Sequence, residues 1–160
     1  MRPPRDDPYW DAFINRPPYD PNNVIPHAFK QVQPGGVNPV RTEVHSPNVM
    51  AQHVKELAHF YGAQRVGIVA LGDGRSAIVC LMRSDYDTTT AHGVGAQTPA
   101  MKGLFATFTL GAYIRELGYT TEPCELEAED LAHKARLVCK GTHIADIIVT
   151  DLPLEPDGKL

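Results

Sequence analysis

The longest regular pattern of apolar residues lies between residues 97 and 118 and predicts a helix that is buried on most sides. Thr98 is its predicted N-cap, Pro99 suits the first helical position, and Gly118 suits a left-handed C-cap. Three- and four-residue steps predict a core face made of Met101, Leu104, Phe105, Phe108, Ala112, Tyr113 and Leu117. A helix, a strand or a flat ligand could approach closely at the small residues Gly103, Ala106, Gly111 and Ala112.

A second helix is predicted to begin at the Ser46-Pro47 pair and to end at Gly62. Its predicted apolar face comprises Val49, Met50, His53, Val54, Leu57, Ala58 and Tyr61. Two short apolar runs follow, at 66–71 and 77–82, with Gly-Asp-Gly between them. Continuous apolar runs of this length are typical of strands covered on both faces, and we expect these two to pair as an antiparallel hairpin.

The remaining pattern predicts a strand at 119–124, a short acidic helix at 125–135, and strands at 136–140 and 142–150. The resulting order, α-β-β-α-β-α-β-β, predicts an α+β domain with a mostly antiparallel sheet flanked by two long helices. We assign this domain to residues 47–160.

Residues 1–46 differ from the rest, because ten of the fourteen prolines lie at or before Pro47 with aromatic residues spaced among them. Proline removes a backbone donor and fixes φ, so the segment is predicted to be an extended Pro-rich arm with one short helix near residues 6–15. Ring burial would anchor such an arm either over the domain itself or over a partner subunit, and both readings stay open.

Composition narrows the functional classes. The 15 basic and 19 acidic residues give a formal charge of −4, which argues against nucleic acid and anionic membranes as partners. No apolar stretch is long enough to span a bilayer, and the first 16 residues lack a signal-peptide core, so we expect a cytoplasmic protein. The three separated cysteines, Cys80, Cys124 and Cys139, are expected to be reduced.

The histidines and cysteines have no metal-ligand spacing, so we expect no dedicated metal site, and no serine has the context of an activated nucleophile. The polar, glycine-containing stretch 84–98 leads into the predicted central helix. Hydroxyls, amides freed by Gly93 and Gly95, and the helix dipole would suit a phosphate or another polar ligand group. An ordinary capped surface loop is an equally good reading, and within the stretch His92 is the better functional candidate.

Four stretches, in the same order, resemble the corrinoid-binding domain of the reductive dehalogenase and epoxyqueuosine reductase family. They are residues 54–68, residues 78–87, Ala-Tyr-Ile-Arg-Glu-Leu-Gly-Tyr at 112–119, and Val-Thr-Asp-Leu-Pro-Leu-Glu-Pro-Asp at 149–157. The two later motifs match the family pattern more specifically. The resemblance implies a nitroreductase-like fold that holds a base-off cobalamin against the sheet and the central helix.

Departures from the family are also clear. The cysteine-rich ferredoxin motifs have no counterpart in this sequence, so we expect no iron–sulfur cluster on the chain. The family's proton-donating tyrosine has no equivalent, because no tyrosine lies between Tyr86 and Tyr113. The family segment rich in Gly and Arg is shortened here to residues 122–142. No catalytic residue is therefore assigned.

The resemblance and its departures favour a cobalamin-binding or accessory subunit that acts beside an iron–sulfur or catalytic partner. Tyr86, His92, Thr98 and Lys102 are the expected cofactor contacts. One alternative is a degenerate, non-catalytic subunit that stabilises a larger partner through the arm. Another is a small flavin-dependent nitroreductase-like oxidoreductase, and the chain could also pair with a second copy of itself.

Overall fold

The computed structural model describes residues 7–87, 89–124, 126–137 and 143–160. In chain order its elements are α1 (Pro8–Asn15), the 3₁₀ turn η1 (Pro21–Asn23), α2 (Ile25–Phe29), α3 (Pro47–Phe60), β1 (Arg65–Ala70), β2 (Ser76–Arg83), the 3₁₀ turn η2 (Val94–Gln97), α4 (Thr98–Glu116), β3 (Thr121–Pro123), α5 (Ala128–Lys134), β4 (His143–Thr150) and β5 (Gly158–Lys159). The predicted mixed α+β class is confirmed. No helix among these residues is long and apolar enough to cross a membrane.

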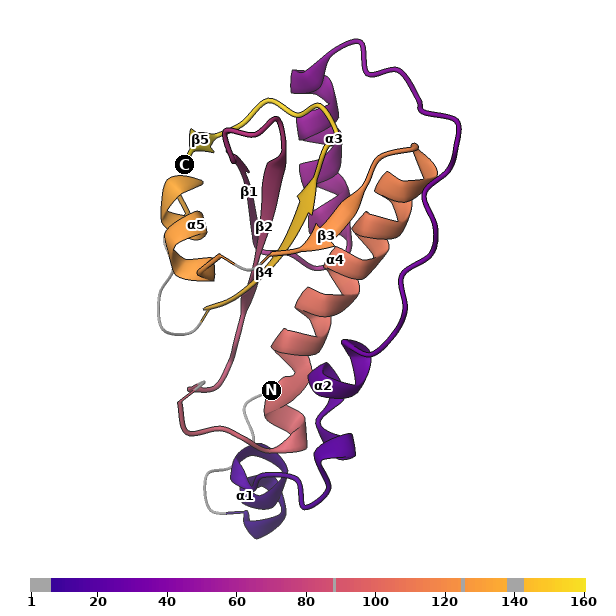
Figure 1. Ribbon diagram of the computed structural model, residues 1–160. Coiled ribbons are helices and arrows are strands. Elements are labelled where there is room, and N and C mark those ends of the chain that lie inside the picture. The colour runs from indigo at the N-terminus through magenta and orange to yellow at the C-terminus, as the bar shows by residue number, and fades with distance from the viewer. Residues whose placement is uncertain (1–6, 88, 125, 138–142) are drawn as a thin grey trace.

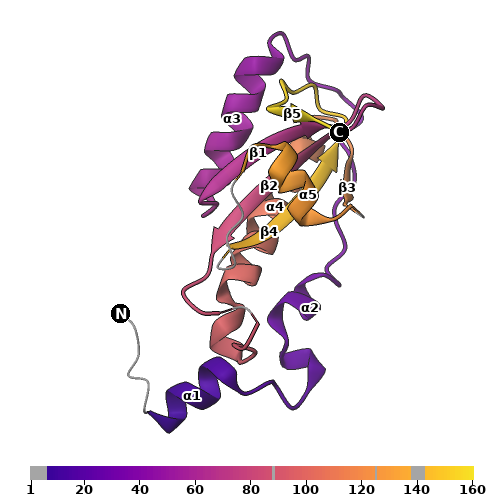
Figure 2. The same cartoon turned by 90° about the vertical axis from the view of Figure 1, so that its left-hand side faces the viewer.

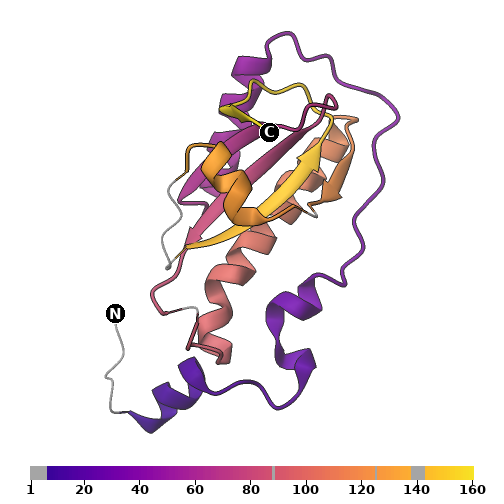
Figure 3. The same cartoon turned by 60° about the vertical axis from the view of Figure 1, so that its left-hand side comes forward.

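A five-stranded sheet in the order β3-β4-β2-β1-β5 forms the centre of the fold. The predicted β1–β2 hairpin is confirmed, with Ile68 opposite Ile78, and β4 and β3 extend the sheet in antiparallel fashion. The two-residue β5 pairs parallel to β1 and has no sequence signal of its own. Figure 1 and Figure 3 show α3 and α4 on one face of the sheet and α5 on the other.

Apolar side chains pack on both faces of the sheet, which explains the continuous apolar runs of β1 and β2. The larger cluster joins α3 and α4 to Ile68, Ile78 and Ile148, and the smaller one joins α5 to Val79 and Leu81. On α3 the buried residues are Ala51, Val54 and Ala58. The prediction of Val49 as a core residue is wrong, since its side chain is 64% exposed.

The predicted core face of α4 is wrong in detail. Ala106, Leu110 and Ile114 are fully buried, whereas Phe105 is 50% exposed, and the other large residues of the predicted face are half-buried. The predicted thin surface explains the difference. A Cβ on Gly111 would lie 2.6 Å from Ile148 Cδ1, so β4 packs against the small side of the helix and the larger rings turn away from it.

Local end signals of the long helices are mostly confirmed. Ser46 Oγ accepts a hydrogen bond from Val49 N–H at 3.3 Å. Gly62 and Gly118 both have left-handed backbone, with φ of 106° and 87°, and each closes its helix. Thr98 is not the N-cap, because the 3₁₀ turn η2 runs directly into α4 and the Thr98 hydroxyl donates back to Gly95 O at 3.2 Å.

The N-terminal segment, residues 7–46, runs along α4 from one end to the other (Figure 1, Figure 2). The predicted short helix is present as α1, and it lies beside η2, where Gly93 N–H donates to Ile14 O at 2.6 Å. Farther along, the ring of Phe29 on α2 meets that of Phe108 edge-on at 5.6 Å.

Residues 38–42 of this segment satisfy the carbonyl groups at the C-terminal end of α4. Asn38 N–H donates to Arg115 O at 2.9 Å and its side-chain amide donates to Glu116 O at 3.1 Å. Thr42 N–H donates to Leu117 O at 2.8 Å, and Arg41 Nε donates to Gly118 O at 3.3 Å. The last carbonyls of a helix have no partner within the helix, so this part of the segment acts as a tertiary cap.

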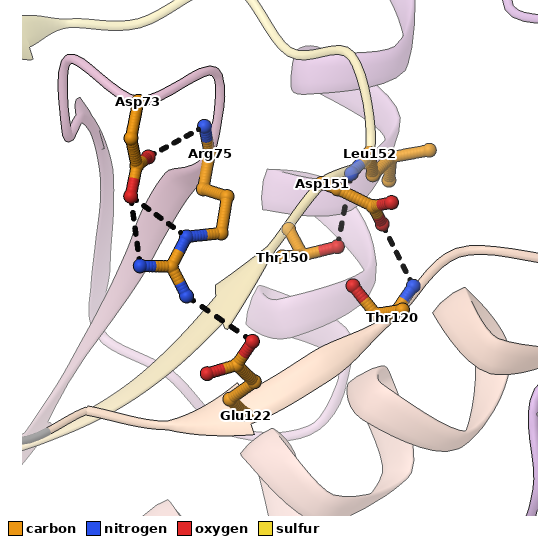
Figure 4. Close-up of polar contacts among 7 residues, drawn as sticks. All are labelled: Asp73, Arg75, Thr120, Glu122, Thr150, Asp151 and Leu152. Carbon is orange, nitrogen blue, oxygen red and sulfur yellow. Dashed lines mark hydrogen bonds and ion pairs between the residues drawn. The ribbon is translucent and has the colours of Figure 1, made fainter.

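The C-terminal third agrees with prediction only in part. The predicted strands at 119–124 and 142–150 correspond to the shorter β3 and to β4. In the predicted strand 136–140, Arg136 instead adopts a left-handed turn with φ of 59°, and residues 138–140 lie outside the described residues. Beyond β4, Asp151 accepts from Thr120 N–H at 2.7 Å, and Thr150 Oγ1 accepts from Leu152 N–H at 3.0 Å (Figure 4).

Candidate functional site

A hollow of about 480 Å³ lies between α4 and the β3–β4 side of the sheet, and we call it the α4–β4 hollow. The segment around α2 and the start of α5 complete its walls. Its apolar lining includes Phe29, Val32, Pro34, Leu104, Phe108, Pro123, Leu126, Ala145, Ile147 and Ile148. Its polar lining is confined to Lys30, Thr107, Arg115, Thr121, Glu122, Cys124 and Asp146. An apolar cavity with a few placed polar groups is the usual form of a small-molecule site.

One stripe of α4 faces this hollow and β4, because Gly103, Thr107, Gly111 and Arg115 follow each other at four-residue steps. A Cβ on Gly103 would lie 3.3 Å from Asp146 Cβ. The two glycines therefore bring β4 close, and Thr107 and Arg115 supply the polar side chains of the stripe. The two residues are eight positions apart in the sequence, so their Cα atoms are about 12 Å apart along the helix axis.

Asp146 is a mostly buried carboxyl group at one end of the hollow. Its Oδ1 accepts from Ile147 N–H at 2.9 Å, and its Oδ2 lies 3.1 Å from Thr107 Oγ1. Burial raises the pKa of Asp146, and the hydrogen bonds from Ile147 and Thr107 and the charge of Lys30 only partly oppose that rise. The carboxyl group thus retains its proton to a higher pH than an exposed aspartate.

The hydroxyl of Thr107 has three acceptors within reach, namely Gly103 O at 3.1 Å, Leu104 O at 3.2 Å and Asp146 Oδ2. One hydroxyl has one proton to donate, so these bonds compete. When Asp146 is protonated, it can donate to Thr107 Oγ1 while the hydroxyl proton goes to a helix carbonyl. The Thr107–Asp146 contact can therefore be hydrogen-bonded in either protonation state of the carboxyl group, and burial is what favours the protonated one.

Replacement of Asp146 by asparagine should stabilise the protein at neutral pH. With a raised pKa in the folded state, the stability that the protonated carboxyl contributes is complete below the unfolded value of 3.8 and is lost as pH rises through the folded pKa. Asparagine keeps both hydrogen bonds without a charge. Urea unfolding at pH 7 and at pH 3.5 should show a gain only at pH 7, and an equal effect at both values would contradict the assignment.

Cys80 stands opposite Asp146 in the β2–β4 ladder and is fully buried. Burial, with a smaller contribution from the Asp146 charge, raises the pKa of the Cys80 thiol to about 12. The thiol is neutral at physiological pH, so Cys80 is a core residue and not a nucleophile.

Arg115 lies at the other end of the hollow. The residue is only 7% exposed, and its Nη1 donates to Thr121 Oγ1 at 2.6 Å. Burial lowers the pKa of Arg115 from its ordinary value, although arginine remains charged at any physiological pH. A buried guanidinium that is held by one neutral hydroxyl lacks the negative charge that would offset its loss of hydration.

A second hollow, of about 530 Å³, lies at the opposite end of α4, and we call it the loop hollow. The loop after β2 and the proline-rich turn between α1 and α2 form it, with the lining residues Pro17, Pro18, Pro21, Val24, Ser84, Ala91, His92, Ala96, Gln97 and Ala100. Two of its polar groups are already used within the chain: Gln97 Oε1 accepts from Ile25 N–H at 2.7 Å, and the Ser84 hydroxyl bonds to the Tyr86 backbone.

The amide of Gly93 is not free for a ligand, contrary to the prediction, and both glycines of this loop lie against α1. A Cβ on Gly93 would lie 2.2 Å from Phe13 O, and one on Gly95 would lie 2.1 Å from the Phe13 ring. Both glycines are needed because α1 packs directly on them. Gly93 N–H is used by Ile14 O, as described above.

Of the four predicted contact residues, the structure places only His92 in the lining of a hollow. Tyr86 is half-buried next to Ser84, whereas Thr98 and Lys102 are exposed on the first turns of α4. Thr98 and Lys102 are four residues apart and therefore share one side of that helix. Tyr86, Thr98 and Lys102 are each within two positions in the sequence of a residue that lines the loop hollow, but they are not part of its lining.

Sequence reasoning missed the α4–β4 hollow, whose polar residues are Thr107, Arg115 and Asp146. A signal was available in the four-residue spacing of Gly103, Thr107, Gly111 and Arg115, and in an acidic residue within an otherwise isoleucine-rich strand. The pattern shows that these residues share a face, but it does not show that Asp146 lies beside them.

Comparison with known proteins supports the fold. No protein-family model matches the sequence, and no curated protein matches it. One match is the solved structure of a reductive dehalogenase, described as suggesting a mechanism for B12-dependent dehalogenation. Its TM-score is 0.68 and its sequence identity is 20%, over 92% of this chain and 27% of that one. The N-terminally tagged catabolic reductive dehalogenase NpRdhA matches with a TM-score of 0.67 and 20% identity, over the same 92% and 27%.

The same dehalogenase in complex with 3-bromo-4-hydroxybenzoic acid gives a TM-score of 0.68 at 19% identity, over 92% of this chain and 28% of that one. This chain therefore spans about a quarter of the length of the dehalogenase structures it matches. At such low identity the likeness concerns the backbone arrangement. Nearly all of this chain shares its fold with one part of the reductive dehalogenases.

Proposed function

We propose that the chain is a corrinoid-binding module that holds cobalamin. The observation that carries the proposal is the fold likeness over 92% of the chain to a structure described as a B12-dependent dehalogenase. The order of the four sequence motifs supports it independently. Residues 1–46 are proposed to act as an arm, and residues 47–160 as the domain that the arm overlies.

The loop hollow and the adjoining face of α4 provide the proposed contacts. A corrin has apolar faces and a rim of amide groups, so its site needs apolar walls and a few polar partners. The hollow has proline and alanine walls with His92 and Gln97 among its polar groups, and Tyr86, Thr98 and Lys102 are close in sequence to its lining residues. Its volume is in the usual range of roughly 300–1,000 Å³ for sites of drug-sized ligands, which suits one edge of the larger corrinoid.

A bound corrinoid would supply a reducible cobalt centre. This chain's residues would position the macrocycle: the His92 imidazole offers a nitrogen of the kind that metals accept, and Lys102 offers a positive charge to the ligand's phosphate. Among the described residues, the side chains include no group of three or more that could hold a metal ion by itself. We propose that electrons reach the cofactor from an iron–sulfur or catalytic partner.

Titration of the purified chain with cobalamin, in oxidised and reduced forms, tests this function. Visible absorbance and calorimetry should show saturable one-to-one binding with a base-off spectrum. His92→Ala should weaken the affinity by about tenfold or more, the equivalent of one lost polar contact. The matched control is His45→Ala, because the His45 side chain is 81% exposed and lies outside the hollow.

Two other outcomes would overturn corrinoid binding. A yellow preparation that releases flavin would favour the nitroreductase-like oxidoreductase. A colourless chain that binds cobalamin in neither oxidation state would favour the non-catalytic subunit.

The non-catalytic reading has its own structural support in the exposed rings of the N-terminal segment. Tyr9 is 86% exposed and Tyr19 is fully exposed, and Phe60 on α3 is 81% exposed. Exposed apolar patches mark protein–protein interaction sites, so this reading proposes that a second protein covers these rings. A larger catalytic subunit or a second copy of this chain could fill that role, and the mass of the purified species in solution distinguishes the two.

A further inference from the structure

The most unusual charge in the described residues is that of Arg115, because the guanidinium is buried without an acidic partner. Its one hydrogen bond goes to the Thr121 hydroxyl, and no described carboxylate lies within 4.0 Å of it. Among the described residues every fully buried side-chain nitrogen and oxygen has a hydrogen-bond partner. The guanidinium nitrogens of Arg115 that lack one must therefore reach accessible surface, and the hollow that Arg115 lines provides it.

The other charged residues of the α4–β4 hollow each lie near a group that can carry the opposite charge. Glu122 Oε1 pairs with Arg75 Nη1 at 3.1 Å, and Arg75 also binds Asp73 at 2.8 Å (Figure 4). Lys30 is the cation that acts on Asp146, whose burial favours the protonated form. When Asp146 is protonated, the positive charges of Lys30 and Arg115 face the single negative charge of Glu122, because Arg75 and Asp73 neutralise each other. The hollow then keeps one net positive charge, and Arg115 is the cation without an acidic partner among the described residues.

This balance selects the charge of a ligand. A single uncompensated guanidinium is neutralised by a monoanion, whereas a doubly charged phosphate would also meet the carboxyl groups of Glu122 and Asp146. With Nη1 held by Thr121, the remaining edge of the guanidinium offers two parallel N–H donors, which match a carboxylate. The apolar walls next to it, including Leu104, Phe108 and Ile148, suit a hydrocarbon tail.

We propose that the α4–β4 hollow binds a small monocarboxylate with an apolar tail, its carboxylate on the free edge of Arg115 and its tail along α4 toward Asp146. The site is separate from the loop hollow at the opposite end of the helix. The proposal does not depend on corrinoid binding, and either ligand can fail to bind without affecting the other.

Octanoate is a suitable probe, and octanamide is its uncharged isostere. Calorimetry and thermal unfolding of the full chain should show saturable octanoate binding and an upward shift of Tm, with octanamide about tenfold weaker or more. Arg115→Met keeps an apolar stem of similar length and should fold, but it should bind the two probes equally weakly. Arg115→Lys keeps the charge without the fork and should fall between them.

Arg65→Met is the matched control, since Arg65 is an exposed arginine on β1 outside the hollow, and its octanoate affinity should equal that of the parent chain. Equal affinities for octanoate and octanamide in the parent chain, or unchanged discrimination in Arg115→Met, would overturn the proposal. Glu125 lies outside the described residues, so Glu125→Gln is included. A tenfold rise in octanoate affinity in that variant would indicate that the chain supplies its own carboxylate, and would also overturn the proposal.

Discussion

Replacement of Ile114 by alanine should lower the free energy of unfolding by about 2–5 kcal/mol, the range for truncating a large, fully buried aliphatic side chain. Ile114 has no exposed surface and belongs to the cluster that joins α3, α4 and the sheet. Chemical denaturation followed by circular dichroism gives the value directly. The effect is large because the neighbouring strands cannot collapse into the space that the side chain leaves.

Phe105→Ala is the matched control on the same helix. Phe105 is larger than Ile114 but is 50% exposed, and its main contact is an edge-on meeting with Tyr61 at 6.0 Å. Its loss should cost about 1 kcal/mol, the value of one aromatic pair. If Phe105→Ala destabilised the protein more than Ile114→Ala, the orientation of α4 described above would be wrong.

Asp157→Ala should cost about 1.5–3 kcal/mol, because the carboxylate makes two charge-assisted hydrogen bonds that are mostly shielded from solvent. Oδ1 accepts from Lys55 Nζ at 2.6 Å, and Oδ2 accepts from Ile68 N–H at 2.8 Å. These bonds join the C-terminal segment to α3 and β1, so alanine would leave both donors without their partner. Urea unfolding of the variant measures the loss.

Asp157→Asn separates the two contributions, since its side-chain oxygen can still accept from Ile68 N–H while the charge opposite Lys55 is lost. Its cost should be intermediate. Glu155→Ala is the control for a neighbouring acidic side chain, because Glu155 is exposed and its side chain makes no hydrogen bond or ion pair with the described residues. If Asp157→Ala were as stable as Glu155→Ala, the two hydrogen bonds of Asp157 would not stabilise the fold as described.

The motif at 149–157 therefore has a structural explanation as well as a family resemblance. Asp151 binds Thr120 N–H and pairs with Arg41 at 2.9 Å, and Asp157 binds Lys55 and Ile68. Both aspartates hold segments distant in the sequence against the sheet. The Leu-Gly-Tyr end of the motif at 112–119 has a similar role, because residues 38–42 form hydrogen bonds with this end of α4. The Arg41 guanidinium carbon also lies 4.6 Å from the centroid of the Tyr119 ring. Both motifs can therefore serve the fold of this chain without a bound cofactor.

Helix ends and strand runs were predictable because their causes are local. Ser46, Gly62 and Gly118 act on backbone groups a few residues away, and the β1–β2 hairpin follows from two apolar runs around a Gly-Asp-Gly turn. The prediction of Thr98 as the N-cap failed because of the residues immediately before it in the sequence. The preceding residues already form η2, so the Thr98 amide and hydroxyl belong to a continuing helical turn.

The sequence by itself determined the α+β class, the two long helices, the central hairpin and the small-residue side of α4, since each follows from periodicity or from a local cap. Only the tertiary structure decided which side of α4 is buried, that residues 38–42 cap it, and that α1 covers Gly93 and Gly95. It alone brought Asp146 beside Thr107 and left Arg115 at a hollow without an acidic partner among the described residues. Those outcomes depend on contacts between residues far apart in the chain, whose free energy no local pattern contains.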